Sequence, residues 1–342
     1  MSLESPPDEV ASTWDGEPLH IERCLLGDLG QRLPVVERRP FAVASPGTLT
    51  IGLPAANPYY DVIVRLPDDR IRTEVPVGIV SKKYRLVQHA ELVDGVIAGL
   101  EAADVQWESL PTTVRLTDLG SRLHFTVHLP KEFRAEIGDD RLDLTIECLN
   151  SVERSRSLRV GMGWIRHICG NGLFIGRVTA SLRRAHVWPL DVEDVPRLVA
   201  GGFQAAKIDE HRWQVRAQTE ISNTALERWV DSTLVKRWGV VAATRALHIA
   251  QTGYDARPAD ARDDAPASRR RVVRTDRVPG SDPPNANVFR IGQILAWLAD
   301  RPGEWGARLE RRHQISQLLA PLRRATSNAP SERDLEPERL LD

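Results

Sequence analysis

Residues 122–130, RLHFTVHLP, decide the fold class of this chain. Apolar and polar side chains alternate along the whole stretch: Leu123, Phe125, Val127 and Leu129 against Arg122, His124, Thr126 and His128. Successive side chains of a β-strand point to opposite faces, so this alternation is typical of a half-buried antiparallel strand. The stretch therefore predicts a sheet with one apolar and one polar face.

The neighbouring segments continue this pattern as a meander. Residues 104–110 (DVQWESL), 112–119 (TTVRLTDL) and 141–150 (RLDLTIECLN) indicate further strands. Residues 157–188 complete the sheet. Within them Asn171-Gly172 predicts a hairpin turn, because both central positions of such a turn need positive φ. A helix C-terminus capped by the same pair is the competing interpretation.

Helical periodicity governs the other parts of the chain. Leu92, Val96 and Leu100 repeat four residues apart and predict an amphipathic helix over 90–102, and longer helical segments follow Pro189. The fold class is therefore α+β: an antiparallel sheet with a packed helix, followed by a mostly helical C-terminal part. We expect a disordered arm (1–18), a sheet-based domain (19–190), a helical segment packed on it (191–253), an exposed loop or linker (254–286), C-terminal helices (287–324) and a disordered acidic tail (325–342).

The composition is that of an ordinary soluble protein. Apolar residues make up 42% and charged residues 27% of the 342 residues, and the net charge is −1. No apolar run approaches the ~18 residues that a membrane helix needs, and the polar N-terminus is unlike a signal peptide. Cys24, Cys148 and Cys169 are too widely spaced to indicate a disulfide framework. We expect a cytoplasmic protein without a cofactor or a membrane partner.

One basic run stands out from this background. The segment from Arg154 to Leu190 carries seven arginines and no acidic residue. Arginines can neutralise the phosphates of a nucleic acid, and an aromatic ring can stack on a base. The residues predicted to bind nucleic acid are Arg154, Arg156, Arg159, Trp164, Arg166, Arg177, Arg183 and Arg184. The alternative is a solvated sheet face in an arginine-rich chain, with the aromatic rings in the core.

Two further patterns bear on function. Five arginines between 269 and 277 form a second basic cluster, which in an exposed loop is interpreted as solvated charge. The candidate metal ligands are His124 and His128 on one strand and His167 and Cys169 on another, which meet only if the two strands are neighbours, with His186 as a fifth possibility. Histidines on an alternating strand are commonly surface or satisfied residues, so we expect no metal. Signatures of nucleotide-binding loops and of serine or zinc hydrolases are absent.

Short motifs are spread over most of the chain. They are IVSKKYRLVQHAEL (79–92), DLGSRLHFTVHLP (118–130), CLNS (148–151), RHICGNG (166–172), RRAHV (183–187) and NVFRIGQILAWLA (287–299). This order resembles a phage/plasmid-like family of unknown function (domain of unknown function 932), found on mobile elements and in prophages. The residues that match its motifs are Tyr84, Gly120, Arg122, Asn150, Cys169, Asn171 and His186.

The chain also departs from the family pattern at two places. Gly172 stands where the family usually has Thr, and VERSRS follows Asn150 and Ser151 where a His-Asp-Gly-Ser type run is more usual. The resemblance implies a mobile-element or genome-defence setting and a connection to nucleic acid. It assigns no reaction to any residue.

These observations together predict a nucleic-acid-binding protein of a mobile element. It is expected to act in recombination, single-strand annealing or genome defence without catalysis, to favour single-stranded DNA and to form a homo-oligomer. The alternatives are a metal-dependent nuclease or hydrolase, and a structural or partner-binding protein. Metal content separates the first prediction from the second.

Overall fold

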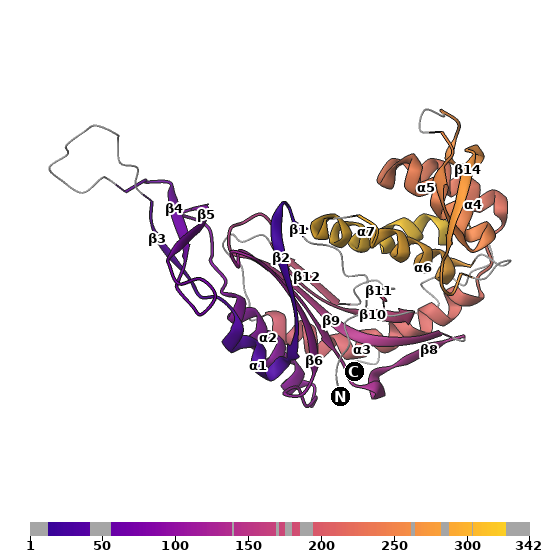
Figure 1. Ribbon diagram of the computed structural model, residues 1–342. Coiled ribbons are helices and arrows are strands. Elements are labelled where there is room, and N and C mark those ends of the chain that lie inside the picture. Colours follow the sequence, from indigo (N-terminus) through magenta and orange to yellow (C-terminus); the bar gives the residue numbers. More distant parts are fainter. Residues whose placement is uncertain are drawn as a thin grey trace.

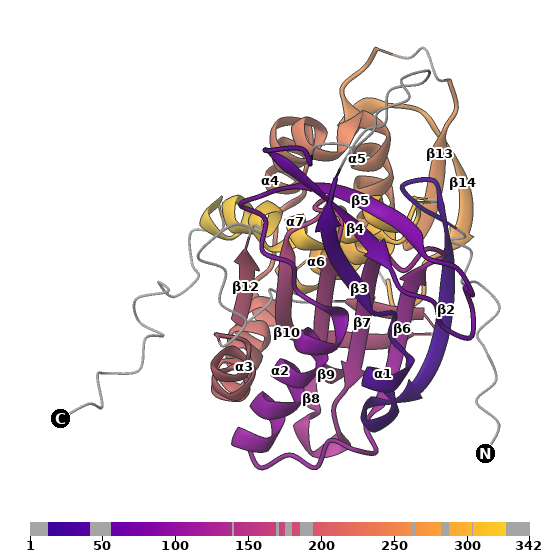
Figure 2. The same cartoon turned by 90° about the vertical axis from the view of Figure 1, so that its left-hand side faces the viewer.

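The protein is built around one curved antiparallel sheet with helices on both of its faces (Figures 1 and 2). The computed structural model describes residues 13–41, 56–138, 140–168, 171–174, 180–184, 194–260, 264–281, 287–302 and 304–325. Sheets and helices coexist in one chain, which confirms the α+β class. In these ranges no helix is both long enough and apolar enough to cross a membrane.

The main sheet has nine strands. They are β1 (Thr13–Trp14), β2 (Glu17–Leu25), β6 (Pro111–Thr117), β7 (Arg122–His128), β8 (Ala135–Ile137), β9 (Asp140–Ser151), β10 (Leu158–Ile168), β11 (Asn171–Phe174) and β12 (Ala180–Arg184). Their order is β1-β2-β6-β7-β9-β10-β11, with β12 also paired to β10 and β8 to β9. All pairings are antiparallel, so the predicted meander from β6 to β10 is confirmed.

The first face of the main sheet is apolar. Phe125, Leu123 and Val127 of β7 are completely buried there, as the alternation predicted. The strand is not half-buried, however, because His124 and Thr126 on its other face are buried as well. Helices α1 (Leu26–Arg32), α2 (His89–Ala102) and α3 (Asp194–Gln218) cover this face. Helices α2 and α3 approach closely at Gly99, where a Cβ would lie 2.5 Å from the Cβ of Val199.

Helix α2 forms where the spacing of its apolar residues predicted it. Leu92, Val93, Val96 and Leu100 are buried in the core. Its first turn is closed by a reciprocal pair, because Gln88 and Glu91 each accept a hydrogen bond from the backbone of the other.

The C-terminal helices lie on the side of the second face (Figure 1). They are α4 (Asn223–Trp229), the π-helical turn η2 (Val230–Leu234), α5 (Val235–Thr252), α6 (Val288–Ala299) and α7 (Trp305–Ala325). Helices α6 and α7 contact the sheet, and α4 and α5 pack against α6 and α7 from farther out. Trp305 and Leu309 of α7 pack with Trp14 and Leu149 in a small apolar cluster on this face. Helix α7 therefore packs directly against the main sheet.

Two smaller sheets and two short 3-10 turns complete the fold. Strands β3 (Val36–Pro40), β4 (Tyr60–Arg65) and β5 (Val75–Ser81) form a sheet that projects from one end of the molecule (Figure 1). Strands β13 (Tyr254–Pro258) and β14 (Val272–Arg277) form a two-stranded ribbon beside α5. The 3-10 turns are η1 (Lys131–Phe133) and η3 (Ala267–Arg269).

The structure corrects four expectations. The predicted arm at 1–18 is too long, because residues 13–18 form β1, a turn and the start of β2, and Trp14 is completely buried. Residues 104–110 contain no strand, because they form the turn that leads from α2 into β6. The predicted linker at 254–286 is not without structure, because it contains β13, η3 and β14. Its two strands pair with each other.

The fourth correction concerns the hairpin at Asn171-Gly172. Strands β10 and β11 do pair as an antiparallel hairpin, but Asn171 lies in β11 opposite Ile168, and Gly172 lies opposite His167. The connection runs through residues 169–170, which lie outside the described residues. The Asn-Gly pair is thus part of a strand, and the helical alternative is wrong.

Candidate functional site

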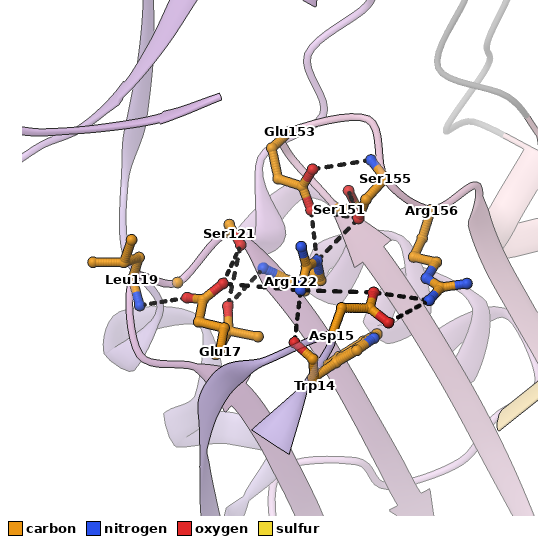
Figure 3. A network of polar contacts seen from close by, with 12 residues as sticks. Trp14, Asp15, Glu17, Leu119, Ser121, Arg122, Ser151, Glu153, Ser155 and Arg156 are labelled. Atoms are coloured by element: carbon orange, nitrogen blue, oxygen red, sulfur yellow. Dashed lines mark hydrogen bonds and ion pairs between the residues drawn. The ribbon is translucent and has the colours of Figure 1, made fainter. Parts of the chain in front are cut away.

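Three turns of the main sheet meet at one end of it (Figure 3). We call this end the sheet corner and define it as residues 14–17, 118–122 and 151–156. Each turn contains a residue with positive φ: Asp15 at 51°, Gly120 at 69° and Arg154 at 75°. Residues other than glycine rarely adopt this conformation, and such strain gathers at functional sites.

Arg122 joins the three turns of the sheet corner (Figure 3). Its Nε donates to Glu153 Oε1 (2.6 Å) and to Ser155 Oγ (2.9 Å). Its Nη1 donates to the carbonyl oxygen of Trp14 (2.8 Å) and lies 3.7 Å from Asp15 Oδ2. The guanidinium is surrounded by carboxylates and only 14% of the side chain is exposed, so Arg122 acts as a clamp between turns.

The acidic residues of the first turn hold the other two turns in place. Asp15 accepts two hydrogen bonds from Arg156 Nη2, at 2.9 and 2.8 Å. Glu17 accepts from the backbone nitrogen of Leu119 (2.7 Å) and from Ser121 Oγ (3.1 Å). Residues expected to be a disordered arm therefore provide the counter-charges of the corner.

Several family-motif residues gather at the same end of the sheet. Tyr84 Oη donates to the carbonyl oxygen of Ser151 (2.8 Å), and Asn150 Nδ2 donates to that of Val87 (3.0 Å). Burial and the nearby Glu153 carboxylate raise the pKa of Tyr84, so its phenol stays a neutral donor. These contacts tie the chain between β5 and α2 to the end of the sheet.

Gly120 completes this connection. Its carbonyl oxygen is hydrogen-bonded to His89 Nε2 (2.9 Å), and a Cβ at this position would lie 2.6 Å from Pro34 Cγ. The positive φ and the lack of space both favour glycine. Of the other motif residues, Asn171 lies in β11, while Cys169 and His186 lie outside the described residues.

The backbone register brings much of the arginine run to the sheet corner. Strands β10 and β12 pair so that Arg183 lies opposite Arg159, and Arg184 opposite Leu158. The turn that carries Arg154 and Arg156 leads directly into this end of β10. Arg166 lies at the other end of β10, opposite Leu142 and Leu173, and Arg177 lies outside the described residues.

The described side chains of the arginine run differ in how accessible they are to a ligand. Arg154 is exposed, but Arg156 is bound to Asp15. Arg159 Nη1 lies 2.6 Å from His313 Nδ1 of α7, within hydrogen-bonding distance, and its Nη2 lies 3.7 Å from Glu310 Oε2. Trp164 is 3% exposed and packs in the main core, so its ring offers no face to a base. The stacking role expected for Trp164 is therefore abandoned.

A buried ionic cluster lies between the polar face of the sheet and α7. Glu147 Oε1 accepts a hydrogen bond from His124 Nε2 (2.8 Å), and Glu147 Oε2 lies 3.8 Å from His313 Nε2. Arg312 Nε donates to Asp300 Oδ1 (2.7 Å), and its Nη1 lies 4.0 Å from Glu147 Oε1. The ring of Trp305 packs edge-on to His124 at 5.2 Å between centroids.

The pKa values of this cluster follow from burial and charge. Burial lowers the pKa of His124 to about 4, although Glu147 opposes the shift. Burial raises the pKa of Glu147, but the hydrogen bond from His124 and the nearby His313 and Arg312 outweigh burial and lower it to about 2. At neutral pH the pair is thus a carboxylate and a neutral imidazole, whose Nδ1 has no hydrogen-bond partner.

Such a pair has the groups for proton transfer but lacks access. His124 is completely buried under Trp305, so a substrate does not reach its Nδ1 in this arrangement. We assign the cluster to the docking of α7 on the sheet.

The zinc hypothesis required the strands of His124 and His167 to be neighbours. They are not, because β9 lies between β7 and β10. His128 Nε2 instead lies 3.2 Å from Thr113 Oγ1, and His124 is bound to Glu147. The side chain of His167 and all of Cys169 lie outside the described residues, and the residues that the structure describes hold no group of three metal-ligating side chains.

Part of the region that carries these features matches a known protein family. A family model described as Domain of unknown function (DUF932) matches residues 76–270, more than half of the chain. The chain belongs to this family. No curated protein and no solved structure is significantly similar to it. The DUF932 region includes Arg122, Glu147 and the β9–β10 turn, but neither Asp15 nor α7.

Sequence reasoning missed several residues of these sites. Asp15 and Glu17 looked like part of a polar arm, and Arg312 and His313 lay in a predicted C-terminal helix without any assigned role. Glu147 follows Asp143 and Thr145 on the polar side of β9, so the alternation placed it on the polar face but gave no signal for its burial.

Proposed function

We propose that the protein binds nucleic acid, with single-stranded DNA as the favoured ligand, through the arginines beside the sheet corner. The register of β10 and β12 supports this most directly, because it places Arg183 and Arg184 of β12 beside the start of β10, next to the turn of Arg154. Arginines that are far apart along the chain thus share one end of an edge of the sheet.

The nature of the groups sets the expected binding mode. Arginine side chains of a folded protein commonly contact phosphates of the nucleic-acid backbone. Such contacts position the nucleic acid but do not distinguish between its bases. Because Trp164 is buried, we expect binding to be dominated by phosphates and to select weakly between bases. Arg154 is exposed and held at positive φ, which is consistent with a residue kept in place for contact.

The biological setting is part of the same proposal. A role in recombination, annealing or genome defence, without catalysis and in an oligomer, fits a protein that binds the DNA backbone non-specifically. It rests on the resemblance of the motifs and on the chemistry of the arginines.

A salt series with a single-stranded oligonucleotide tests the proposal. The variant combines Arg154→Gly, Arg183→Ala and Arg184→Ala; glycine at 154 suits the φ of 75°, so the charged side chain is removed without straining the backbone. Each lost phosphate contact lowers the slope of log affinity against log salt by about 0.7, so we expect a decrease of about 2. Fluorescence anisotropy at several salt concentrations measures this slope.

Arg141→Ala is the matched control. Its side chain is 74% exposed near the opposite end of β9, and we expect the variant to bind like the parent. The proposal is wrong if the parent shows no binding at low salt, or if the triple variant keeps the slope of the parent.

A further inference from the structure

Two arginines of the run are covered by elements from distant parts of the chain. Asp15, in the turn between β1 and β2, accepts two hydrogen bonds from Arg156 Nη2, at 2.9 and 2.8 Å (Figure 3). On α7, His313 Nδ1 lies 2.6 Å from Arg159 Nη1, and Glu310 Oε2 lies 3.7 Å from Arg159 Nη2. A carboxylate is an oxyanion, as a phosphate is. Asp15 and Glu310 therefore lie where a nucleic-acid backbone would contact these two arginines.

The two covering elements are joined to each other. Thr13 of β1 forms a parallel β-bridge with Glu304, the residue before α7, and Thr13 Oγ1 donates to Glu304 Oε1 at 2.5 Å. Trp14 and Trp305, the next residue of each segment, pack in the same apolar cluster. Figure 1 shows β1 beside the start of α7.

The first turn of α7 also approaches the covered arginine. A Cβ on Gly306 would lie 2.9 Å from Arg156 Nη2 and 3.1 Å from Asp15 Oδ1. We call residues 13–17 together with residues 304–313 the clasp. Because its two parts are bonded to each other and to the arginines, the clasp covers both arginines as one unit.

The clasp combines its apolar cluster with buried polar atoms that are not satisfied. In the described part of the chain, Trp14 Nε1, Trp305 Nε1 and Glu304 Oε2 are buried and have no hydrogen-bond partner. A buried polar atom without a partner costs free energy, since water would satisfy it. Opening the clasp returns these three atoms to water, so its release costs less than the release of a purely apolar contact of the same size.

We propose that the clasp is an autoinhibitory cover, which occupies Arg156 and Arg159 in the free protein and is displaced by single-stranded DNA. The inference rests on the proposed function and adds the regulation of the same site. The phosphates of the ligand compete with Asp15 and Glu310 for the two guanidinium groups. Because the open form offers two more phosphate contacts, the ligand binds it better and shifts the protein towards it.

A disulfide between β1 and the start of α7 tests the cover in the full chain. Thr13→Cys and Glu304→Cys occupy bridged positions, and bridged segments lie ~4.8 Å apart, within the Cα separations that a disulfide spans. The oxidised form keeps the clasp closed, and the reduced form lets it open. Both forms have the same sequence and net charge, so each is the control of the other. Circular dichroism and thiol labelling establish that both are folded and that the bond is formed.

Anisotropy with a single-stranded oligonucleotide over a salt series measures the effect. The reduced form should show a slope of log affinity against log salt that is larger by about 1.4, because it gains two phosphate contacts at ~0.7 each. The oxidised form retains the contacts outside the clasp. The slope of the parent should be the same under oxidising and reducing conditions.

A second variant weakens the clasp without a disulfide. It combines Asp15→Asn, which tolerates the φ of 51°, with Glu310→Gln, which keeps the length of the side chain. The loss of two partly exposed ion pairs increases the open population, so binding should become about tenfold tighter at constant salt. The control combines Glu108→Gln and Glu136→Gln, two exposed carboxylates at the opposite end of the sheet, and should bind like the parent.

The outcomes distinguish the clasp from the proposed function. Measurable binding whose slope is no larger in the reduced form than in the oxidised form overturns the clasp and leaves the proposed function standing. Equal gains in the Asp15→Asn/Glu310→Gln variant and in its control also overturn the clasp, because the gain then reflects net charge. Absence of binding in the parent and in both forms of the disulfide variant overturns both proposals.

Discussion

The two faces of the main sheet are made by the same strands and differ in almost every physical respect. On the first face Phe125 and its neighbours pack against α2 and α3, and burial of apolar area stabilises the contact. On the second face His124 and Glu147 are equally buried, but beneath α7 and in a polar cluster. Burial there has to be compensated by paired charges and hydrogen bonds.

This difference teaches how the two layers of helices are attached. The stability that an apolar contact provides does not depend on pH, but it decreases when a side chain loses volume. The stability that a polar contact provides depends on the protonation of its groups. The stability of the first layer is therefore expected to depend on packing, and that of the second layer on charge.

The largest effect is expected on the apolar face. Phe125→Ala removes a completely buried ring and should lower the free energy of unfolding by about 3–5 kcal/mol, since the cavity only partly collapses. Urea denaturation followed by circular dichroism measures it. Thr126→Ala, at the next residue and on the other face, is the control and should cost less than half as much. Equal losses would remove the distinction between the faces.

A pH titration of stability sharpens the comparison from the polar side. The pKa of His124 is about 4 in the folded protein, below its ordinary value, so the unfolded chain binds a proton that the folded chain does not. Stability is then complete above pH ~6.5 and is lost as the pH falls towards 4, by about 2 kcal/mol between pH 7 and pH 5. Glu147, whose pKa is lowered as well, acts in the same direction at lower pH.

His124→Gln is the variant that checks this assignment, with urea denaturation at pH 7 and at pH 5. Its stability should change less over this interval than that of the parent, because the titrating group is gone. Phe125→Ala should retain the full pH dependence. A parent-like dependence in His124→Gln would place the proton uptake elsewhere.

The smallest effect concerns one hydrogen bond on the polar face. Thr145 Oγ1 donates to the carbonyl oxygen of Gly163 at 3.2 Å and is completely buried. Thr145→Val keeps the shape of the side chain and should cost about 1 kcal/mol, the net contribution of one such bond. Thermal unfolding detects it. No change in stability would mean that the polar face tolerates loss of this bond, and that its charges matter more.

Local patterns were sufficient for most strands and helices, and insufficient for the sites. The alternation in 122–130 predicted β7 and its two faces, and the spacing of Leu92, Val96 and Leu100 predicted α2. The ribbon was missed because β13 and β14 are short, lie far apart in a segment rich in Pro and Asp, and stabilise each other only after they pair. The hairpin turn was misplaced by two residues, since the register of β10 overrode the preference of Asn171-Gly172.

The sequence by itself determined the fold class, the amphipathic elements and the basic character of the run from Arg154 onwards, because these depend on residues that are close in the chain. Only the tertiary structure decided that Trp164 faces the core, that Arg122 is clamped by Asp15 and Glu153, and that β9 separates the candidate zinc ligands. These outcomes depend on which strands become neighbours and which helix covers which face. Pairing over long distances along the chain is selected by the packing of the whole core, and no local pattern contains it.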